Sequence, residues 1–287
     1  MNSTIGISTW SLQHTSYTRG MDIYEMIDVI AGMGVDGLDL YNEYIPCYPA
    51  LNLHELNRIL DRCRANNLPI TTTWFMADIV SGCLAASEDA FLEEMKNYLA
   101  ITAACGCDLL TLPMLFNVPG LTHDDHFACM MRFFEKAVPV AERYNVRFAH
   151  ELPRQGTPDM GIRLAKALDN RFYTLCPDLE AWRLETEDIP LVHAEMGPGE
   201  VCVPETVEIF RECLKYSASV HFKLLALDEK GEEPHFPIPE LMQAINESPN
   251  KLHLALEYEG WIPDLYPERD CIEENRRCVE LIRKYQK

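Results

Sequence analysis

Short apolar runs rich in β-branched and aromatic residues alternate with amphipathic helical runs from one end of the chain to the other. This alternation is typical of a parallel sheet wrapped by helices. Eight units favour a closed (β/α)8 barrel over an open doubly wound sheet. The glycine-rich phosphate loops of nucleotide-binding sheets, GxGxxG and GxxxxGK(S/T), do not occur. The eight strand-like runs lie at residues 4–8, 35–41, 69–74, 108–112, 146–151, 172–178, 219–223 and 252–257.

The segments between these runs carry apolar residues at helical spacing. The longest predicted helices cover residues 88–104 and 122–144, and Thr122 and Asp125 have the spacing of a capping box at the start of the second. Shorter helices are expected near residues 23–34, 53–63, 162–168, 205–215, 239–245 and 272–282.

One segment breaks the regular pattern. Residues 183–203 contain several prolines, glycines and acids, which indicates a long loop on the active-site face. Neither a linker nor a low-complexity segment divides the chain, and α/β barrels commonly reach about 250 residues as one unit. The 287 residues therefore predict a single TIM-barrel domain over residues 1–287.

Acidic residues outnumber basic residues by 45 to 25, which gives a net charge of −20. Such a chain repels phosphate backbones and anionic membranes, so we expect neither nucleic acid nor a membrane as a partner. The start of the sequence lacks a basic, apolar leader, and no stretch reaches the roughly 18 apolar residues of a membrane span, which predicts a cytoplasmic protein. The eleven cysteines are scattered and odd in number, so buried free thiols are expected rather than disulfides.

Polar residues stand at the ends of three predicted strands, five, six and eight, and within the seventh. They are Glu151, Asp178, His221 and Glu257. In a barrel, the carboxyl ends of the strands converge on the active site. Three carboxylates and an imidazole gathered there would repel one another unless a cation compensated them, which predicts one divalent metal ion. The carboxylate-rich ligand set favours Mn²⁺ or Mg²⁺, with Co²⁺ and Zn²⁺ as alternatives. Isolated strand-end carboxylates that meet solvent are the competing interpretation.

Tryptophans follow three of the predicted strands, at Trp10, Trp74 and Trp182. A flat apolar face at the barrel mouth can stack on a sugar ring or an aromatic group, and core packing is the alternative. We assign Trp10 and Trp182 to substrate binding. For Trp74 we favour a role in core packing. In strand two, Asp39 is interpreted as a surface carboxylate or as a support for the site.

Three histidines lie near the predicted site without being metal ligands. His193 and His235 fall in long loops near the mouth, where they would act as acid–base groups or be solvated loop residues. We assign His193 to substrate binding. His150 is next to Glu151, and strand alternation turns it away from the barrel lumen, which favours a structural role.

Four short strings together resemble the xylose isomerase-like barrels, a superfamily that includes ketose 3-epimerases, inosose dehydratases and isomerases, and endonuclease IV. The strings are HELP at 150–153, CPD at 176–178, SVHFK at 219–223 and LALEYEG at 254–260. ISTWSL in the first predicted unit and VDGLDLY in the second extend the resemblance over nearly the whole chain.

The resemblance implies a sugar or cyclitol isomerase or epimerase. In epimerases of the superfamily, the two metal-binding glutamates, here Glu151 and Glu257, exchange protons beside a carbonyl through an enediolate. Lys223 completes an H-x-K string and would bind a substrate oxygen or form an ion pair with Asp178 or Glu180. Two departures leave the substrate open. Ala181 replaces a second histidine of many epimerases, and Leu224 follows the H-x-K string where an aspartate is common.

The same resemblance leaves other functions open. The catalytic subunit of C-glycoside deglycosidases is similar to these barrels, and it would imply carbon–carbon bond cleavage with a small β-sandwich partner chain. Endonuclease IV-like repair requires more zinc ligands and a basic face, which the net charge opposes. A sugar-binding barrel without catalysis is a further alternative. The superfamily also implies a homo-oligomer, with residues 183–203 as a candidate contact.

Overall fold

The computed structural model describes residues 3–47, 51–84, 88–115, 118–154, 156–184, 204–263 and 265–287. Within these ranges, eight parallel strands form one sheet in the order β6-β5-β4-β3-β2-β1-β8-β7. The strands are β1 Ser3–Ser8, β2 Gly37–Tyr41, β3 Ile70–Trp74, β4 Leu109–Pro113, β5 Arg147–Leu152, β6 Tyr173–Pro177, β7 Ser219–Leu224 and β8 Leu252–Tyr258. All eight predicted strands are present, with shifts of one or two residues at their ends.

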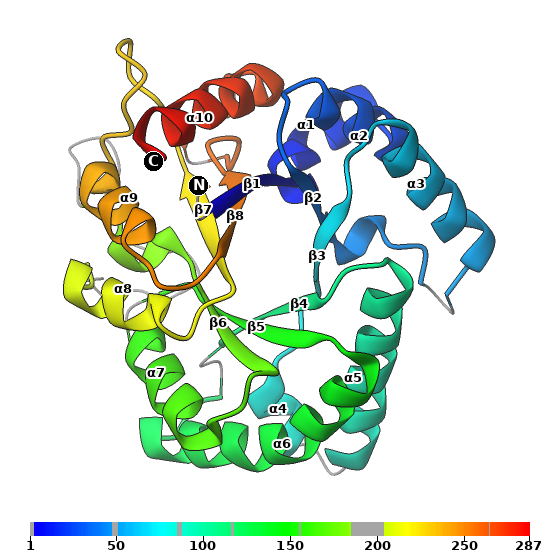
Figure 1. Ribbon diagram of the computed structural model, residues 1–287, viewed down its shortest axis with the longest axis vertical. Coiled ribbons are helices and arrows are strands. Elements are labelled where there is room, and N and C mark those ends of the chain that lie inside the picture. Colours follow the sequence, from blue (N-terminus) through cyan, green and yellow to red (C-terminus); the bar gives the residue numbers. More distant parts are fainter. Residues whose placement is uncertain are drawn as a thin grey trace.

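The two ends of this sheet meet and close the barrel. Isolated parallel bridges join Leu175 to Ser217 and Asp178 to His221, which links β6 to β7. The backbone N–H of Ala218 also donates to the carbonyl of Leu175 at 3.2 Å. Seen down the barrel in Figure 1, the strands surround a central axis and the helices form an outer ring. The predicted (β/α)8 TIM barrel is therefore confirmed.

The helices cover the outer face of the strands. They are α1 Gln13–Arg19, α2 Ile23–Ala31, α3 Leu53–Ala65, α4 Ile79–Leu84, α5 Glu88–Ala104, α6 His123–Tyr144, α7 Thr157–Leu168, α8 Val207–Leu214, α9 Ile238–Asn246 and α10 Cys271–Tyr285. The capping box predicted for α6 is present: Asp125 N–H donates to Thr122 Oγ1 at 3.2 Å, and Thr122 N–H donates to Asp125 Oδ2 at 2.9 Å. The short helices α1 and α4 were not predicted, because six or seven residues are too few to show helical periodicity.

Strands buried on both faces account for the continuous apolar runs of the sequence. Every residue of β4, β7 and β8 is buried, as expected for parallel strands that lie between a filled barrel interior and a layer of helices. The apolar side chains form one main core between sheet and helices. Among the described residues, ten cysteines are free and all but Cys47 are buried, which confirms the predicted role of thiols as small core residues.

A hydrogen-bonded pair of polar side chains, His253 and Asp39, occupies the barrel interior. His253 Nε2 lies 2.8 Å from Asp39 Oδ1, and Thr71 Oγ1 donates to the same oxygen at 2.7 Å. Asp39 is only 3% exposed, so its interpretation as a surface carboxylate was wrong. Gly6 makes room for this pair, since a Cβ at that position would lie 2.6 Å from the His253 ring.

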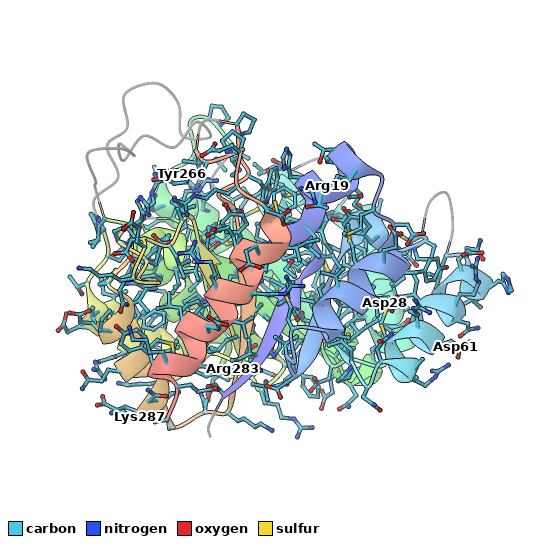
Figure 2. All side chains as sticks on the ribbon, turned by 90° about the horizontal axis from the view of Figure 1, so that it is seen from above. Arg19, Asp28, Asp61, Tyr266, Arg283 and Lys287 are labelled. Atoms are coloured by element: carbon cyan, nitrogen blue, oxygen red, sulfur yellow. The ribbon has the colours of Figure 1, made fainter. Side chains whose placement is uncertain are left out.

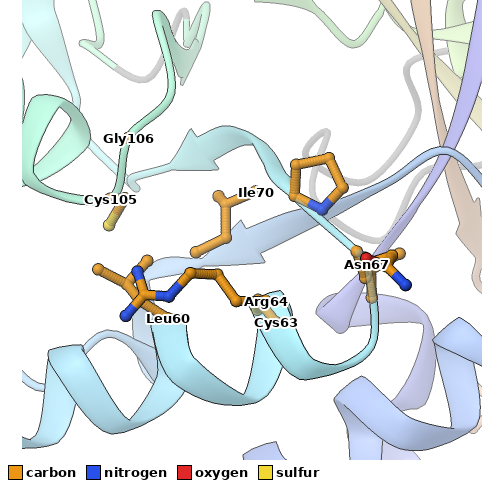
Figure 3. Close-up of a pocket in the computed structure, with 9 residues that line it drawn as sticks. Leu60, Cys63, Arg64, Asn67, Ile70, Cys105 and Gly106 are labelled. Atoms are coloured by element: carbon orange, nitrogen blue, oxygen red, sulfur yellow. The ribbon is translucent and has the colours of Figure 1, made fainter.

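The two ends of the barrel differ. Figure 2 shows the barrel from the side, with Tyr266, which follows β8, at the end where strands terminate and Lys287 at the other end. At the end where strands begin, a groove of about 420 Å³ lies between the last turn of α3, the start of β3 and the residues after α5 (Figure 3). Its walls are mainly apolar and include Leu60, Ile70 and Cys105.

The long loop predicted at residues 183–203 falls almost entirely outside the described residues. Within the described ranges, no helix has the length and apolar character needed to cross a membrane.

Candidate metal centre

Four consecutive strands place the predicted tetrad at one end of the barrel. Glu151 is the second-last residue of β5, and Asp178 directly follows β6. His221 lies within β7, and Glu257 is the second-last residue of β8. The bridge between Asp178 and His221 aligns the end of β6 with the middle of β7. All four side chains therefore project into the barrel at the level where its strands end.

The four residues offer one ligand atom each, and these atoms all lie within 4.8 Å of one another. His221 Nδ1 is 3.1 Å from Glu151 Oε1 and 3.5 Å from Glu257 Oε2. All four side chains are buried, unlike the exposed acidic groups that often cluster on surfaces without a ligand. The predicted residues thus form one compact set of oxygen and nitrogen donors.

Burial and neighbouring positive charge shift the pKa values of the carboxyl groups in this cluster in opposite directions. Burial raises the pKa of Glu257 to about 7 and raises the pKa of Asp178 well above its usual range. Burial also works to raise the pKa of Glu151, but the charge and hydrogen bond of His221, with help from Lys223 and Trp74, lower it to about 2. The cluster therefore holds more potential negative charge than its own cations balance, which is the electrostatic condition for binding a cation.

Asp178 shows that the donor set fits a metal ion. Its Oδ1 accepts a hydrogen bond from the backbone N–H of Glu180 at 2.8 Å. Its Oδ2 is buried and accepts no hydrogen bond among the described residues, although Lys223 Nζ lies 3.0 Å away. A buried carboxylate oxygen with free lone pairs beside two further carboxylates and an imidazole suits a divalent cation.

Neighbouring groups orient the donors. Trp74 Nε1 donates to Glu151 Oε2 at 2.7 Å, which fixes the rotation of that carboxylate. Such supporting hydrogen bonds are typical of protein metal sites. The sequence favoured a core role for Trp74, but the structure brings its indole into contact with a donor residue.

Lys223 lies between two carboxylates. Its Nζ is 3.0 Å from Asp178 Oδ2 and 3.3 Å from Glu259 Oε1. The sequence left open an ion pair with Asp178 or Glu180, and the structure shows the pair with Asp178, while Glu180 forms an ion pair with Arg183 at 3.1 Å. Glu259 was not singled out in the sequence, although it stands two residues after Glu257 in the LALEYEG string.

Four aromatic side chains form a continuous surface beside the tetrad, here called the aromatic wall. Trp261, Trp10, Tyr41 and Trp74 follow one another with ring-centroid distances of 5.2, 5.0 and 4.7 Å. All four are partly exposed. They come from the ends of β1, β2 and β3 and from the segment after β8, so the mouth of the barrel has an aromatic side and a ligand side.

Sequence reasoning missed two members of the aromatic wall. Tyr41 is the last residue of β2, so the same strand-end filter that selected the tetrad would have found it. Trp261 lies three residues after β8, and only the folded loop brings it against Trp10.

Trp182, which the sequence assigned to substrate binding, lies elsewhere. It is fully buried, packs against Phe210 at a centroid distance of 4.8 Å, and its Nε1 donates to the carbonyl of Thr206 at 2.8 Å. This placement corrects the assignment, because a side chain with no exposed surface packs the layer between barrel and helices rather than meeting a ligand.

The histidines outside the tetrad have different surroundings. His150 points outward, where its Nδ1 lies 2.8 Å from the Tyr173 hydroxyl and burial lowers its pKa to about 3, so the predicted structural role fits. His235 is buried and contacts Glu233 and the Tyr266 hydroxyl, which makes its interpretation as a solvated loop residue wrong. His193 lies outside the described residues.

The fold and the site together define a class: (β/α)8 barrels with a buried acidic and histidine tetrad at the ends of strands five to eight. The sequence matches the xylose isomerase-like TIM barrel family over residues 27–279, and the chain belongs to that family. A search of curated proteins found no significant match.

Solved structures with the same fold include several sugar enzymes. D-psicose 3-epimerase from Clostridium cellulolyticum aligns with a TM-score of 0.71 and 13% identity over 98% of this chain and 99% of that chain. A sugar phosphate isomerase/epimerase from Parabacteroides distasonis gives 0.70 and 14% identity over 99% and 96%. The 3-keto-D-glucoside 4-epimerase from E. coli gives 0.68 and 13% over 98% and 99%. At these identities the likeness establishes the fold.

Proposed function

We propose that the protein is a divalent-metal-dependent isomerase or epimerase of sugars or cyclitols, which moves a proton on the carbon beside a carbonyl group. The observation that carries this proposal is the buried tetrad, in which Glu151 and Glu257 flank the single imidazole of His221 at 3.1 and 3.5 Å. The names of similar structures, a D-psicose 3-epimerase and a 3-keto-D-glucoside 4-epimerase, support this reaction class.

Glu151, Asp178, His221 and Glu257 would hold the metal. The carboxylate-rich donors favour Mn²⁺, with Mg²⁺, Co²⁺ and Zn²⁺ as alternatives. When bound, a divalent ion polarises a carbonyl group and acidifies the neighbouring C–H. We assign the proton transfers to the two glutamates: one carboxylate takes the proton from the carbon, and the other returns a proton to that carbon.

Other residues of the mouth would position the substrate. Trp74 holds Glu151 in one orientation through its indole hydrogen bond. The side chain of Lys223 is 11% exposed, and its ammonium is suited to bind a substrate oxygen. Trp10 and its neighbours in the aromatic wall offer flat faces to the apolar side of a sugar ring and limit the access of water.

A deuterium-exchange experiment tests the reaction class. The protein with Mn²⁺ is incubated in D2O with a panel of ketoses and keto-cyclitols, and loss of the C–H signal beside the carbonyl is followed by NMR. We expect exchange on at least one compound, and a decrease of about 100-fold or more in Glu151→Gln and in Glu257→Gln. Compounds that bind without exchange or product would contradict the proposal.

The aromatic wall supports a second candidate, cleavage of a C-glycosidic bond. Four partly exposed aromatic rings packed in series, two of the contacts edge-to-face, line one side of the mouth, and an aromatic lining of this kind suits a substrate with an attached aromatic group. Aryl C-glycosides in the same panel distinguish the two reactions, because cleavage releases the aglycone. This candidate also involves a small second subunit, whereas the first involves a homo-oligomer, and light scattering of the purified protein separates these assemblies.

A further inference from the structure

Lys223 stands between the tetrad and a carboxylate that does not belong to it. Its Nζ lies 3.0 Å from Asp178 Oδ2 and 3.3 Å from Glu259 Oε1. The side chains of Lys223 and Glu259 are 11% and 14% exposed, and that of Asp178 is fully buried. Water therefore screens this charge triad only weakly, and the ammonium interacts with both carboxylates at close range.

The position of Glu259 is fixed independently of Lys223. Trp10 Nε1 donates to Glu259 Oε1 at 2.9 Å. The backbone N–H of Glu259 donates to the carbonyl of Leu224 at 2.9 Å, which anchors the residue to the end of β7. A carboxylate held from two directions offers a stationary counter-charge for a long and flexible lysine side chain.

The ammonium and a divalent cation require the same atom. The Oδ2 of Asp178 accepts no hydrogen bond among the described residues, and Lys223 is the cation beside it. A metal ion held by the tetrad would use a lone pair of Asp178, so Lys223 and the metal repel each other and share this carboxylate. The more firmly the ammonium is held by another acid, the less it opposes the metal.

We propose that Glu259 is a positioning residue that shares the Lys223 ammonium with Asp178, so that the ammonium opposes a divalent cation in the tetrad less strongly, and that Glu259 thereby sets the affinity of the tetrad for that cation. The inference rests on the metal centre of the proposed function. It assigns Glu259 a role that acts through Lys223 and not through direct contact with the metal.

The signs of the expected changes follow from the charges. In Glu259→Gln, Lys223 keeps its charge but loses one of the two carboxylates with which it forms ion pairs in the described part of the chain, so we expect Mn²⁺ to bind about tenfold more weakly. In Lys223→Met, the competing cation is gone, so we expect tighter binding by a similar factor. In the double variant no ammonium remains to be positioned, so Glu259→Gln changes the affinity less than about threefold at 0.15 M salt.

Mn²⁺ binding to the purified full-length chain, measured by the EPR signal of free Mn²⁺, tests this cycle. Glu43→Gln is the matched control: Glu43 is an acid of the same end of the barrel, after β2, and its partners are Gln13 and Tyr17. We expect its affinity to equal that of wild type. Circular dichroism checks folding, and Glu259→Asp serves if Glu259→Gln does not fold, since the shorter acid is expected to weaken binding by less than tenfold.

The outcomes separate the inference from the function on which it rests. A wild-type protein that binds neither Mn²⁺ nor, in equilibrium dialysis, Mg²⁺, Co²⁺ or Zn²⁺ overturns both. The inference alone is overturned if the wild type binds Mn²⁺ and Glu259→Gln weakens that binding equally with Lys223 present and with Lys223 replaced by Met. The charge of Glu259 would then act on the metal directly. No effect of Glu259→Gln overturns it as well. A loss that disappears in the Lys223→Met background supports it.

Discussion

At the scale of single residues, two tryptophans that follow strand ends have opposite roles. The indole of Trp74 donates to Glu151 at 2.7 Å, whereas the indole of Trp182 donates to a backbone carbonyl and packs against Phe210. In the sequence both look alike, because an aromatic residue at a strand end is consistent with either a binding surface or a core. Only the direction of the side chain, set by the local backbone, separates the two.

Exchange of each tryptophan for phenylalanine makes this difference measurable. Trp74→Phe removes the hydrogen bond that orients Glu151, so we expect Mn²⁺ binding to weaken about tenfold with little loss of stability. Trp182→Phe removes a buried hydrogen bond and packing volume, so we expect about 1–3 kcal/mol lower stability and unchanged Mn²⁺ affinity. Calorimetric titration with Mn²⁺ and urea unfolding measure both variants. Equal effects of the two on Mn²⁺ affinity would contradict the assignment.

At the scale of elements, the strands were predictable because both faces of each strand are buried. Short, mostly apolar runs such as LLTLP at 109–113 then mark a strand. The tetrad followed from the same pattern, since a charged residue that closes such an apolar run is costly to bury unless it binds a partner. Glu259 and Trp261 could not be predicted from this pattern. They lie in the segment after β8, where loop geometry rather than periodicity decides which way a side chain points.

The long helices are joined by surface ion pairs that a pH titration can reveal. Glu88 at the start of α5 pairs with Lys136 and Arg132 of α6. The hydrogen bond from Lys136, opposed by burial and assisted by the charges of Lys136 and Arg132, lowers the pKa of Glu88. The folded state therefore binds fewer protons at this site than the unfolded state, and its stabilising contribution is present at neutral pH and lost as pH falls.

We expect Glu88→Gln to be less stable than wild type at pH 7, and the difference to shrink as pH falls below the ordinary pKa of a glutamate and to vanish once the lower pKa of the folded state is passed. Thermal unfolding between pH 3 and pH 8 measures the difference. Glu93→Gln is the control, because Glu93 pairs with Lys96 inside α5 and joins no second helix. A constant difference between Glu88→Gln and wild type at all these pH values would contradict an electrostatic origin.

At the scale of the whole molecule, the net charge of −20 opposes the compact state through self-repulsion. Salt screens this repulsion over a Debye length of about 10 Å at 0.1 M. We expect the melting temperature at pH 8 to rise as NaCl increases from low concentration to about 0.2 M, and the rise to shrink near pH 4 as carboxylates protonate. Differential scanning calorimetry in a salt series measures it. A melting temperature that falls with salt at pH 8 would show that attractive surface pairs dominate instead.

The division of the barrel mouth has a consequence for how such a protein can diversify. The donors of the tetrad come from four successive units in the second half of the chain, and three of the four rings of the aromatic wall come from units in the first half. The four donors and most of the aromatic wall thus come from separate stretches of the chain, and Trp74 links the two through its hydrogen bond to Glu151. Under the proposed function, we expect a chimaera that takes only its first two units from another family member to keep the four ligands and Trp74, and to change its choice of substrate rather than its metal.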